Sequence, residues 1–281
     1  MTTVHALSIA GSDPSGGAGI QADLKTFCAL GAYGMTALTA LTVQNTCGVR
    51  DVHPVPPEFV AGQIDAVFED VRVDAVKIGM LGRAETIEAV AGRLAQWRPA
   101  TVVLDPVMVS KSGHRLLDEA AVASLRDRLV PTATVITPNL PEAGVLLDAA
   151  PPASLQAMYG FAERLHGLGA AAVLLKGGHL DDAEACDVLY DGESFQVLRA
   201  PRVVTRNTHG TGCTLSSAIA ALAPRAASLA QAAGGAKRYL TAALQGADRL
   251  GVGHGQGPVN HGEALPRPDP VTAVLLDDHG A

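Results

Sequence analysis

The sequence has little of what a nucleic-acid or membrane protein needs. Its formal net charge is −7, and aromatic residues make up 4% of the 281 residues, with a single tryptophan. Without a basic field or a set of aromatic side chains for base stacking, we expect no nucleic-acid partner. The N-terminus has no basic segment before a long apolar run, and no stretch reaches the ~18 apolar residues of a membrane span. We therefore expect no membrane partner and a cytoplasmic location.

Cysteine is also scarce, and the four cysteines are far apart. Cys28, Cys47, Cys186 and Cys213 form no C-x-x-C pair. This spacing supports neither a disulfide framework nor a zinc ribbon. We interpret the first three as structural, because Cys28 lies in the apolar stretch FCAL and Cys186 lies beside a strand-like run. Cys213 differs, because glycines precede it in the segment NTHGTGC.

What the chain does contain is an alternation of short apolar runs with longer stretches rich in alanine and leucine. The runs have the length of strands, and they are VHALSIAG, GMTALTALTVQ, DAVKIGML, TVVLDPVMV, TVITPN and AAVLLKGG. Strands that alternate with helices predict an α/β fold with a mostly parallel sheet. The pair Asp191-Gly192 between two strand-like runs predicts a hairpin, and hence an antiparallel edge.

The same pattern indicates one domain. We find no internal repeat and no linker long enough to divide the chain. We therefore expect a single domain over residues 1–262. Residues 263–281, whose composition is biased towards proline and aspartate, are predicted to form a peripheral tail.

Several predicted strands end in polar or glycine residues: Gly11-Ser12-Asp13, Gln44-Asn45, Gly79-Met80, Asp105-Pro106, Pro138-Asn139 and Lys176-Gly177. Open parallel sheets bind ligands at the carboxyl ends of their strands, so this recurrence predicts one site that many strands supply. The first of these loops, GSDPSGGAG, matches neither G-x-x-x-x-G-K-[ST] nor G-x-G-x-x-G. A tight strand-to-helix turn with Asp13 as a turn residue explains it equally well.

Three further segments suit the transfer of a phosphoryl group from a nucleotide. Asp105 and Glu142 offer hard oxygen ligands for Mg²⁺ at neighbouring strand ends. Lys176 precedes two glycines, which would let a nucleotide phosphate approach its ammonium group. The alternatives are a helix cap formed by Asn139 with Glu142 three residues later, and a solvated lysine at a strand end.

Residues 207–216, NTHGTGCTLS, place Cys213 where a glycine turn becomes a helix. Free amides and the positive end of the helix dipole favour an anion at such a turn. We expect the helix terminus to lower the pKa of the thiol, which would let it accept a proton from a hydroxyl group, although a nearby phosphate would oppose this. The alternative is a small side chain that only packs against the turn.

Together these segments resemble the hydroxymethylpyrimidine and hydroxymethylpyrimidine-phosphate kinases of thiamine biosynthesis, in the ribokinase-like superfamily. The motifs that carry the resemblance span about residues 6–261 and are GSDPSGGAGIQADLKTF, TALTVQNT, VKIGMLG, VLDPVMVSKSG, TPNLPEA, LLKGGH, NTHGTGCTLSSAIAA and GPVNH. The resemblance implies a three-layer α/β/α fold. It also implies that ATP and Mg²⁺ serve to phosphorylate a pyrimidine alcohol and then its monophosphate.

The resemblance also implies roles for single residues. Gln44 would read the pyrimidine ring, in a pocket bordered by Asp23 and lined by Ala18, Met80 and Val107. Lys176, Thr208 and Asn139 would bind the nucleotide, and Asp105 and Glu142 the metal. Gly210, Thr211, Gly212 and Cys213 would form the anion hole, with Cys213 as the base on the acceptor side.

Two histidines stand out. The family leads us to expect an acidic residue where this chain has His114 in KSGHRLL. His209, inside the anion turn, suits a backbone or substrate-orienting role.

Three other functions stay open, and the first of them comes from the family resemblance. A pyridoxal or pyridoxine kinase shares the cysteine-type turn, but Gln44 favours an aminopyrimidine because an amide both donates and accepts hydrogen bonds. A non-catalytic nucleotide or vitamin sensor would have no need of Cys213, Lys176 and Glu142 together. A thiol redox function lacks a resolving cysteine. We also expect a homodimer, with the hairpin near Asp191 as a candidate surface.

Overall fold

A computed structural model describes residues 2–108, 117, 119–178, 180 and 183–263. In this part of the chain, one 8-stranded sheet has the strand order β10-β9-β8-β7-β6-β5-β1-β2, and β3 and β4 form a separate two-stranded sheet. The strands are β1 Val4–Ala10, β2 Ala32–Leu38, β3 Ala40–Asn45, β4 Gly48–Pro54, β5 Ala75–Ile78, β6 Val102–Leu104, β7 Val135–Ile136, β8 Val173–Lys176, β9 Glu184–Tyr190 and β10 Phe195–Pro201.

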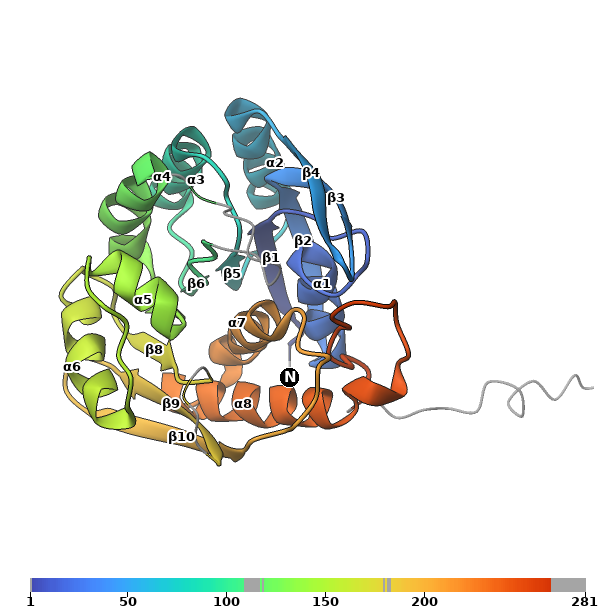
Figure 1. Ribbon diagram of the computed structural model, residues 1–281. Coiled ribbons are helices and arrows are strands. Elements are labelled where there is room, and N and C mark those ends of the chain that lie inside the picture. Colours follow the sequence, from blue (N-terminus) through green and yellow to red (C-terminus); the bar gives the residue numbers. More distant parts are fainter. Residues whose placement is uncertain (1, 109–116, 118, 179, 181–182, 264–281) are drawn as a thin grey trace, which may run out of the picture.

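Helices cover both faces of the large sheet (Figure 1). They are α1 Gly19–Ala29, α2 Pro57–Asp70, α3 Ala84–Trp97, α4 Glu119–Ser124, α5 Leu140–Leu146, α6 Leu155–His166, α7 Thr211–Leu222 and α8 Leu229–Gln245. Helices α1, α7 and α8 pack on one face, and α2 to α6 pack on the other. The predicted three-layer α/β/α architecture with a mostly parallel sheet is confirmed.

Alternation along the strands explains the two layers. Side chains of a strand point to opposite faces in turn, so a strand that is apolar throughout must be covered on both sides. Leu7 and Ile9 of β1 belong to the core on the side of α2 to α6, whereas Val4 and Ala6 belong to the core on the side of α1, α7 and α8.

The edge of the sheet is antiparallel, as the Asp191-Gly192 signal predicted. β9 pairs antiparallel with both β8 and β10, whereas the pairs from β8 to β2 are parallel. Gly192 has a φ of 92°, which glycine adopts without a steric penalty.

The run GMTALTALTVQ is not one strand, which corrects the sequence-based expectation. It divides at Thr39 into β2, which belongs to the large sheet, and β3, which pairs with β4. The side chain of Thr39 donates to the carbonyl oxygen of Met80 at 2.6 Å, and its amide donates to the carbonyl of Ala10 at 3.1 Å. These bonds hold the chain at the end of the sheet, so that β3 projects beyond it and carries Gln44 over the carboxyl ends of the strands.

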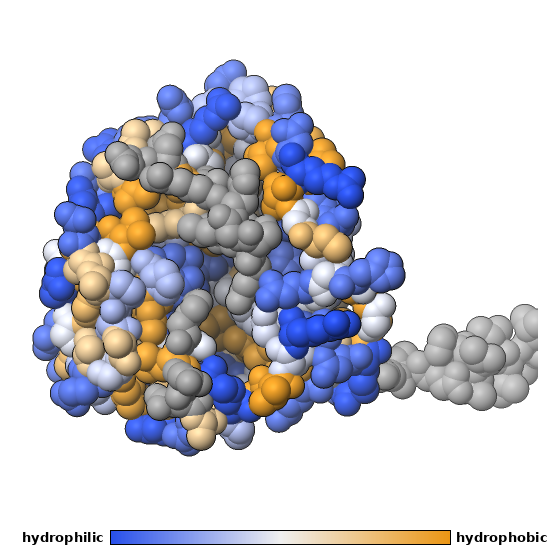
Figure 2. All heavy atoms as spheres, in the orientation of Figure 1, coloured by the Kyte–Doolittle hydropathy of each residue, from blue (hydrophilic) through white to orange (hydrophobic). Residues whose placement is uncertain are grey.

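None of the described helices is both long enough and apolar enough to span a bilayer. Figure 2 shows hydrophilic residues around the outer edge of one face of the molecule and hydrophobic residues toward its hollowed centre.

Candidate active site

A cavity of about 660 Å³ lies at the carboxyl ends of the parallel strands. It is lined by residues that follow β1, β5, β6, β7 and β8, by Gln44 from β3, and by the first turn of α7. Every predicted site residue except Asp23 lines it: Gln44, Ala18, Met80, Val107, Asp105, Asn139, Glu142, Lys176, Thr208, Gly210, Thr211, Gly212 and Cys213. Segments far apart in the sequence thus meet at one place, as the strand-end pattern predicted.

The turn before α7 depends on glycine. Gly210 has a φ of 80°, and a Cβ atom there would lie 1.8 Å from the carbonyl oxygen of Gly17. The helix begins at Thr211, so the amides of Gly212 and Cys213 have no acceptor within the helix. A Cβ atom at Gly212 would lie 3.3 Å from a carboxylate oxygen of Asp105 and 3.4 Å from the ammonium of Lys176. The turn therefore brings free amides close to a cation, in an arrangement that suits a phosphate group.

Cys213 faces the cavity, but its thiol does not have the lowered pKa that the sequence led us to expect. Burial, aided by the carboxylates of Asp23 and Asp105, raises the pKa of Cys213 from the ordinary 9.0 to about 11, although the ammonium of Lys77 lowers it. The expectation weighed the helix terminus against a bound phosphate but left out burial of the thiol, and loss of hydration outweighs the effect of the helix terminus here. The thiol is therefore protonated at neutral pH when no ligand is bound.

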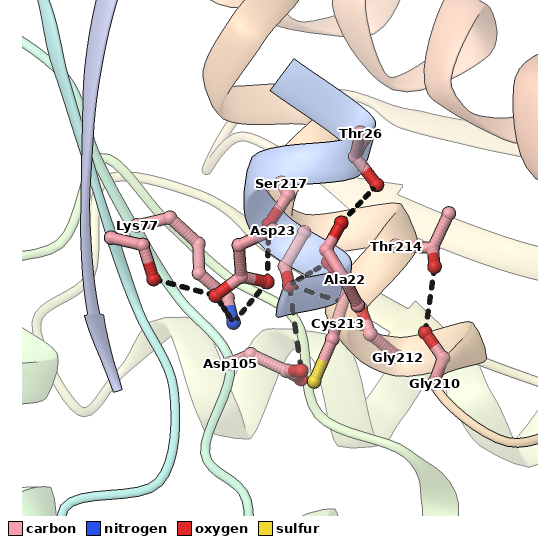
Figure 3. Close-up of polar contacts among 12 residues, drawn as sticks. Ala22, Asp23, Thr26, Lys77, Asp105, Gly210, Gly212, Cys213, Thr214 and Ser217 are labelled. Carbon is pink, nitrogen blue, oxygen red and sulfur yellow. Dashed lines mark hydrogen bonds and ion pairs between the residues drawn. The ribbon is translucent and has the colours of Figure 1, made fainter. Parts of the chain in front are cut away.

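Asp23, which the resemblance placed at the border of the pyrimidine pocket, does not itself line the cavity. Its side chain is fully buried and accepts two bonds from the ammonium of Lys77, each of 2.9 Å. Ser8 donates to the same carboxylate at 2.5 Å and Ser217 donates at 2.7 Å. Figure 3 shows this group of side chains beside the first turns of α7. Asp23 thus holds Lys77, and Lys77 rather than Asp23 lines the cavity.

Lys176 lies between two carboxylates at the end of β8. Its ammonium is 2.8 Å from Asp105 Oδ1 and 3.9 Å from Glu142 Oε2. Burial alone would lower the pKa of Lys176, but Asp105 and Glu142 raise it above the ordinary value of 10.5. Lys176 therefore stays charged, and its contact with Asp105 and its nearness to the α7 amides put its charge where a nucleotide phosphate would lie.

Asn139 and Glu142 form the helix cap that the sequence offered as the alternative to ligand binding. The amide of Glu142 donates to Asn139 Oδ1 at 2.8 Å, and the amide of Asn139 donates to Glu142 Oε2 at 2.7 Å. Both residues also line the cavity. The capping box fixes the Glu142 carboxylate at the cavity wall, so the structural role and a role in binding are compatible.

The carboxylates of Asp105 and Glu142 fit a magnesium ion that arrives with a nucleotide. Both are buried, and both face Lys176. Mg²⁺ is commonly bound by one or two carboxylates together with substrate phosphates and water. Within the described residues no group of three or more His, Cys, Asp and Glu side chains could hold a metal alone. The donor set therefore suits a shared ion rather than a closed protein cage.

The cavity lining also includes a polar pair, Asp187 and Lys237, that sequence reasoning missed. Lys237 of α8 donates to Asp187 Oδ2 at 2.6 Å, and the amide of Gly177 donates to Asp187 Oδ1 at 3.0 Å. The apolar side chains of Leu240 and Leu244 line the cavity nearby. The signal was Asp187 itself, a charge within the apolar strand run CDVLY.

A model of the phosphomethylpyrimidine kinase family matches residues 13–260. The chain belongs to this family. The hydroxymethylpyrimidine/phosphomethylpyrimidine kinase of Escherichia coli is 56% identical over 261 residues, which cover 93% of this chain and 98% of that protein. The resemblance found in the sequence motifs is thereby confirmed.

Solved structures of this phosphomethylpyrimidine kinase group and of a vitamin kinase share the fold. Phosphomethylpyrimidine kinase from Clostridium difficile matches with a TM-score of 0.76 and 43% identity, over 85% of this chain and 98% of that one. An ADP complex of pyridoxal kinase from Bacillus subtilis matches with a TM-score of 0.86 and 39% identity, over 93% of this chain and 98% of that one.

The other three cysteines differ in their exposure to solvent. Cys28 and Cys47 are exposed, against the expectation that both are structural, because FCAL lies at the end of α1 with Cys28 on its outer face. Cys186 is buried, as expected. His114 lies outside the described residues.

Proposed function

We infer that this chain is an ATP-dependent kinase that phosphorylates 4-amino-5-hydroxymethyl-2-methylpyrimidine and then its monophosphate, in thiamine biosynthesis. The observation that carries this inference is that one cavity is lined by the Gln44 amide, by the glycine turn with the Cys213 thiol, and by Lys176 between its two carboxylates. The 56% identity to the Escherichia coli kinase over nearly the whole chain supports the same substrate.

The pyrimidine is proposed to lie between Gln44 and the apolar residues Ala18, Met80 and Val107, with its hydroxymethyl group toward Cys213. An amide can donate to a ring nitrogen and accept from the neighbouring amino group, which makes Gln44 suited to this ring. The apolar lining covers the faces of a flat ring and excludes water from the acceptor oxygen.

The nucleotide is proposed to extend from the anion turn toward Asp187 and Lys237, with Asn139, Lys176 and Thr208 near its phosphates. The amides of Gly212 and Cys213 would bind the oxygens of the migrating group, and Lys176 would balance their charge. Asp105 and Glu142 would hold Mg²⁺, which neutralises phosphate charge when it is bound.

In the transfer, the acceptor oxygen forms a bond to the terminal phosphorus, the bond from that phosphorus to the bridging oxygen breaks, and ADP leaves. The proton of the acceptor hydroxyl passes to the sulfur of Cys213 when that sulfur is ionised. Because the thiol is mostly protonated at neutral pH, we expect this step to speed up as the pH rises.

We also propose that the chain works as a cytoplasmic homodimer. Large apolar side chains are exposed on β2, β3 and α2, namely Tyr33, Leu41, Val43 and Phe59, and a second copy would cover them. At the hairpin near Asp191, Phe195 is less exposed than any of these. The test is the mass of the particle by light scattering in the wild type and in Val43→Lys, which should be monomeric if this surface is the interface.

The decisive experiment is incubation with the pyrimidine alcohol, ATP and Mg²⁺, followed by mass analysis of the products. Formation of monophosphate and then diphosphate is the expected result, and Cys28→Ala, a change on the exposed face of α1, serves as the control variant. A parallel reaction with pyridoxal tests the nearest alternative, and a much larger kcat/KM for pyridoxal would contradict the assignment. Binding of both ligands without product would instead indicate a sensor.

A further inference from the structure

The side chain of Thr214 makes an additional hydrogen bond at the start of α7. Gly210 is the N-cap residue of this helix, and its carbonyl oxygen accepts the first bond of the helix, from the amide of Thr214 at 2.8 Å. The Thr214 hydroxyl donates to the same oxygen, also at 2.8 Å (Figure 3). The carbonyl that begins the helix is therefore held by two bonds instead of one.

The ring of His261 completes this arrangement. Its Nε2 lies 3.0 Å from the hydroxyl oxygen of Thr214. That hydroxyl has one hydrogen and a carbonyl has none to donate, so the contact between Thr214 and Gly210 uses the hydroxyl hydrogen. Nε2 of His261 must then supply the hydrogen of its own bond with Thr214. The bonds run in one direction, from His261 through Thr214 to the Gly210 carbonyl.

His261 is buried and attached to α8. Only 6% of its surface is exposed, and its carbonyl accepts from the hydroxyl of Tyr239 at 2.8 Å. The amide of the preceding Asn260 donates to the carbonyl of Ala243 at 3.0 Å. Burial lowers the pKa of His261 to about 4, so the ring is neutral at pH 7 and its one N–H hydrogen is the one on Nε2. The donor of the chain is thus fixed in place.

The same C-terminal segment holds the residues that precede the turn. The amide of His209 donates to the carbonyl of Gly257 at 3.1 Å, and the carbonyl of His209 accepts from the amide of Val259 at 3.3 Å. The chain before the turn and the first turn of α7 are therefore both attached to residues 257–261. The free amides that face the cavity lie between these two attachments.

We propose that His261, through Thr214, positions the amides of the turn before α7, which makes both of them positioning residues for the phosphoryl transfer. The inference rests on the proposed function, in which the amides of Gly212 and Cys213 bind the migrating group. Neither His261 nor Thr214 is among the described residues that line the cavity, so their effect must pass through the turn. Misplacement of a donor by about 1 Å can cost roughly 100-fold in rate.

The experiment measures kcat and the Kd of the pyrimidine alcohol in variants of Thr214. Thr214→Val keeps the shape but has no hydroxyl, and it should lower kcat by roughly 10-fold or more, with Kd within about 2-fold of the wild-type value. Thr214→Ser keeps the hydroxyl and should restore most of the wild-type kcat. Thr132→Val is the matched control, because the Thr132 hydroxyl also donates to a main-chain carbonyl, that of Leu129 at 2.7 Å, away from the cavity.

Variants of His261 test whether it acts through Thr214. His261→Gln keeps an N–H donor near the position of Nε2, whereas His261→Leu has none. We expect kcat to fall by roughly 10-fold in His261→Leu and by much less in His261→Gln. In a Thr214→Val background, His261→Leu should lower kcat no further.

Three results would overturn the proposal. They are an unchanged kcat in Thr214→Val, a further loss from His261→Leu in the Thr214→Val background, and a loss of pyrimidine affinity as large as the loss of kcat. The last would indicate a general loosening of the structure.

A measurement on the wild type keeps the proposal testable if the variants fail to fold. Nitrogen NMR of labelled histidine should show a proton on Nε2 of His261 at pH 7, and an unprotonated Nε2 would overturn the proposal. If the wild type forms no product from the pyrimidine alcohol, the proposed function has failed, and the positioning role with it. If it forms product and kcat ignores Thr214→Val, only the positioning role has failed.

Discussion

The reactivity of the Cys213 thiol toward iodoacetamide should reveal how strongly the site suppresses its ionisation. The thiolate, not the thiol, is the reacting form. With a pKa raised from 9.0 to about 11, the thiolate fraction at pH 8 is ~100-fold smaller than that of an ordinary cysteine. A more basic thiolate is also more nucleophilic, which reduces the deficit in rate to roughly 10-fold.

The assay follows the alkylation rate of Cys213 from pH 6 to pH 10 by mass spectrometry of the peptide. Cys28 and Cys47 are exposed and would consume reagent, so both are replaced by serine in the test protein. The rate should climb steadily with pH and show no plateau in this range. A plateau at or below pH 8 would refute the reasoning, because it would mean that the helix terminus outweighs burial.

Two variants of the buried Lys77–Asp23 ion pair should change the alkylation rate in opposite directions. Lys77 lowers the pKa of Cys213 and Asp23 raises it. Lys77→Met should therefore slow alkylation, and Asp23→Asn should speed it up. A purely structural effect would loosen the site and change both rates in the same direction, so two changes of equal sign would count against the electrostatic account. Circular dichroism checks that each variant is folded, since breaking a buried pair costs about 3–5 kcal/mol.

Four other changes test the site and the fold. Cys213→Ala should lower kcat by ~10²–10⁴ and leave pyrimidine affinity unchanged, and the wild-type kcat should rise with pH through neutrality; a near-normal kcat in the variant would make the thiol a bystander. Gln44→Ala should act mainly on pyrimidine affinity, which calorimetry measures, and unchanged affinity would misplace the ring. Gly210→Ala should abolish turnover, because the added Cβ would collide with the carbonyl of Gly17 and because alanine disfavours the positive φ at this position. Measured turnover close to that of the wild type would contradict this. Burial lowers the pKa of His261 from 6.5 to about 4. Between these two pH values His261 is therefore neutral in the folded protein and protonated in the unfolded chain. Stability should thus fall by about 3 kcal/mol as the pH drops from about 6.5 to about 4, and urea titrations of His261→Gln should show a smaller fall.

The fold could be predicted from the sequence because its signals are local. The apolar runs around β1, β5 and β8 have the length of strands, and stretches of helical length separate them. The pair Asp191-Gly192 marks the hairpin. The division of the run 34–44 at Thr39 was not predictable in this way. It depends on bonds from Thr39 to Ala10 and Met80, which lie in other segments of the chain.

The cavity residues could be predicted where they follow strands, but their ionisation could not. Asp105 and Lys176 stand at strand ends, and that position alone brings them together. The raised pKa of Cys213 arises from its burial and from Asp23 and Asp105, and these surroundings exist only after folding. A lysine within the apolar run DAVKIGML was the one local sign that Lys77 is buried with a partner, and Asp23 is that partner.

The contact between Gly17 and Gly210 also bears on synthesis of the protein. The loop that follows the first strand packs against the turn before α7, with no side chain between the two backbones. About 210 residues, more than two thirds of the polypeptide, must therefore be synthesised before the loop and the turn can meet, and such distant pairings form slowly. Chains still being synthesised should therefore lack a complete ligand-binding cavity for most of their elongation. Products truncated before this turn should form much of the sheet but have no kinase activity.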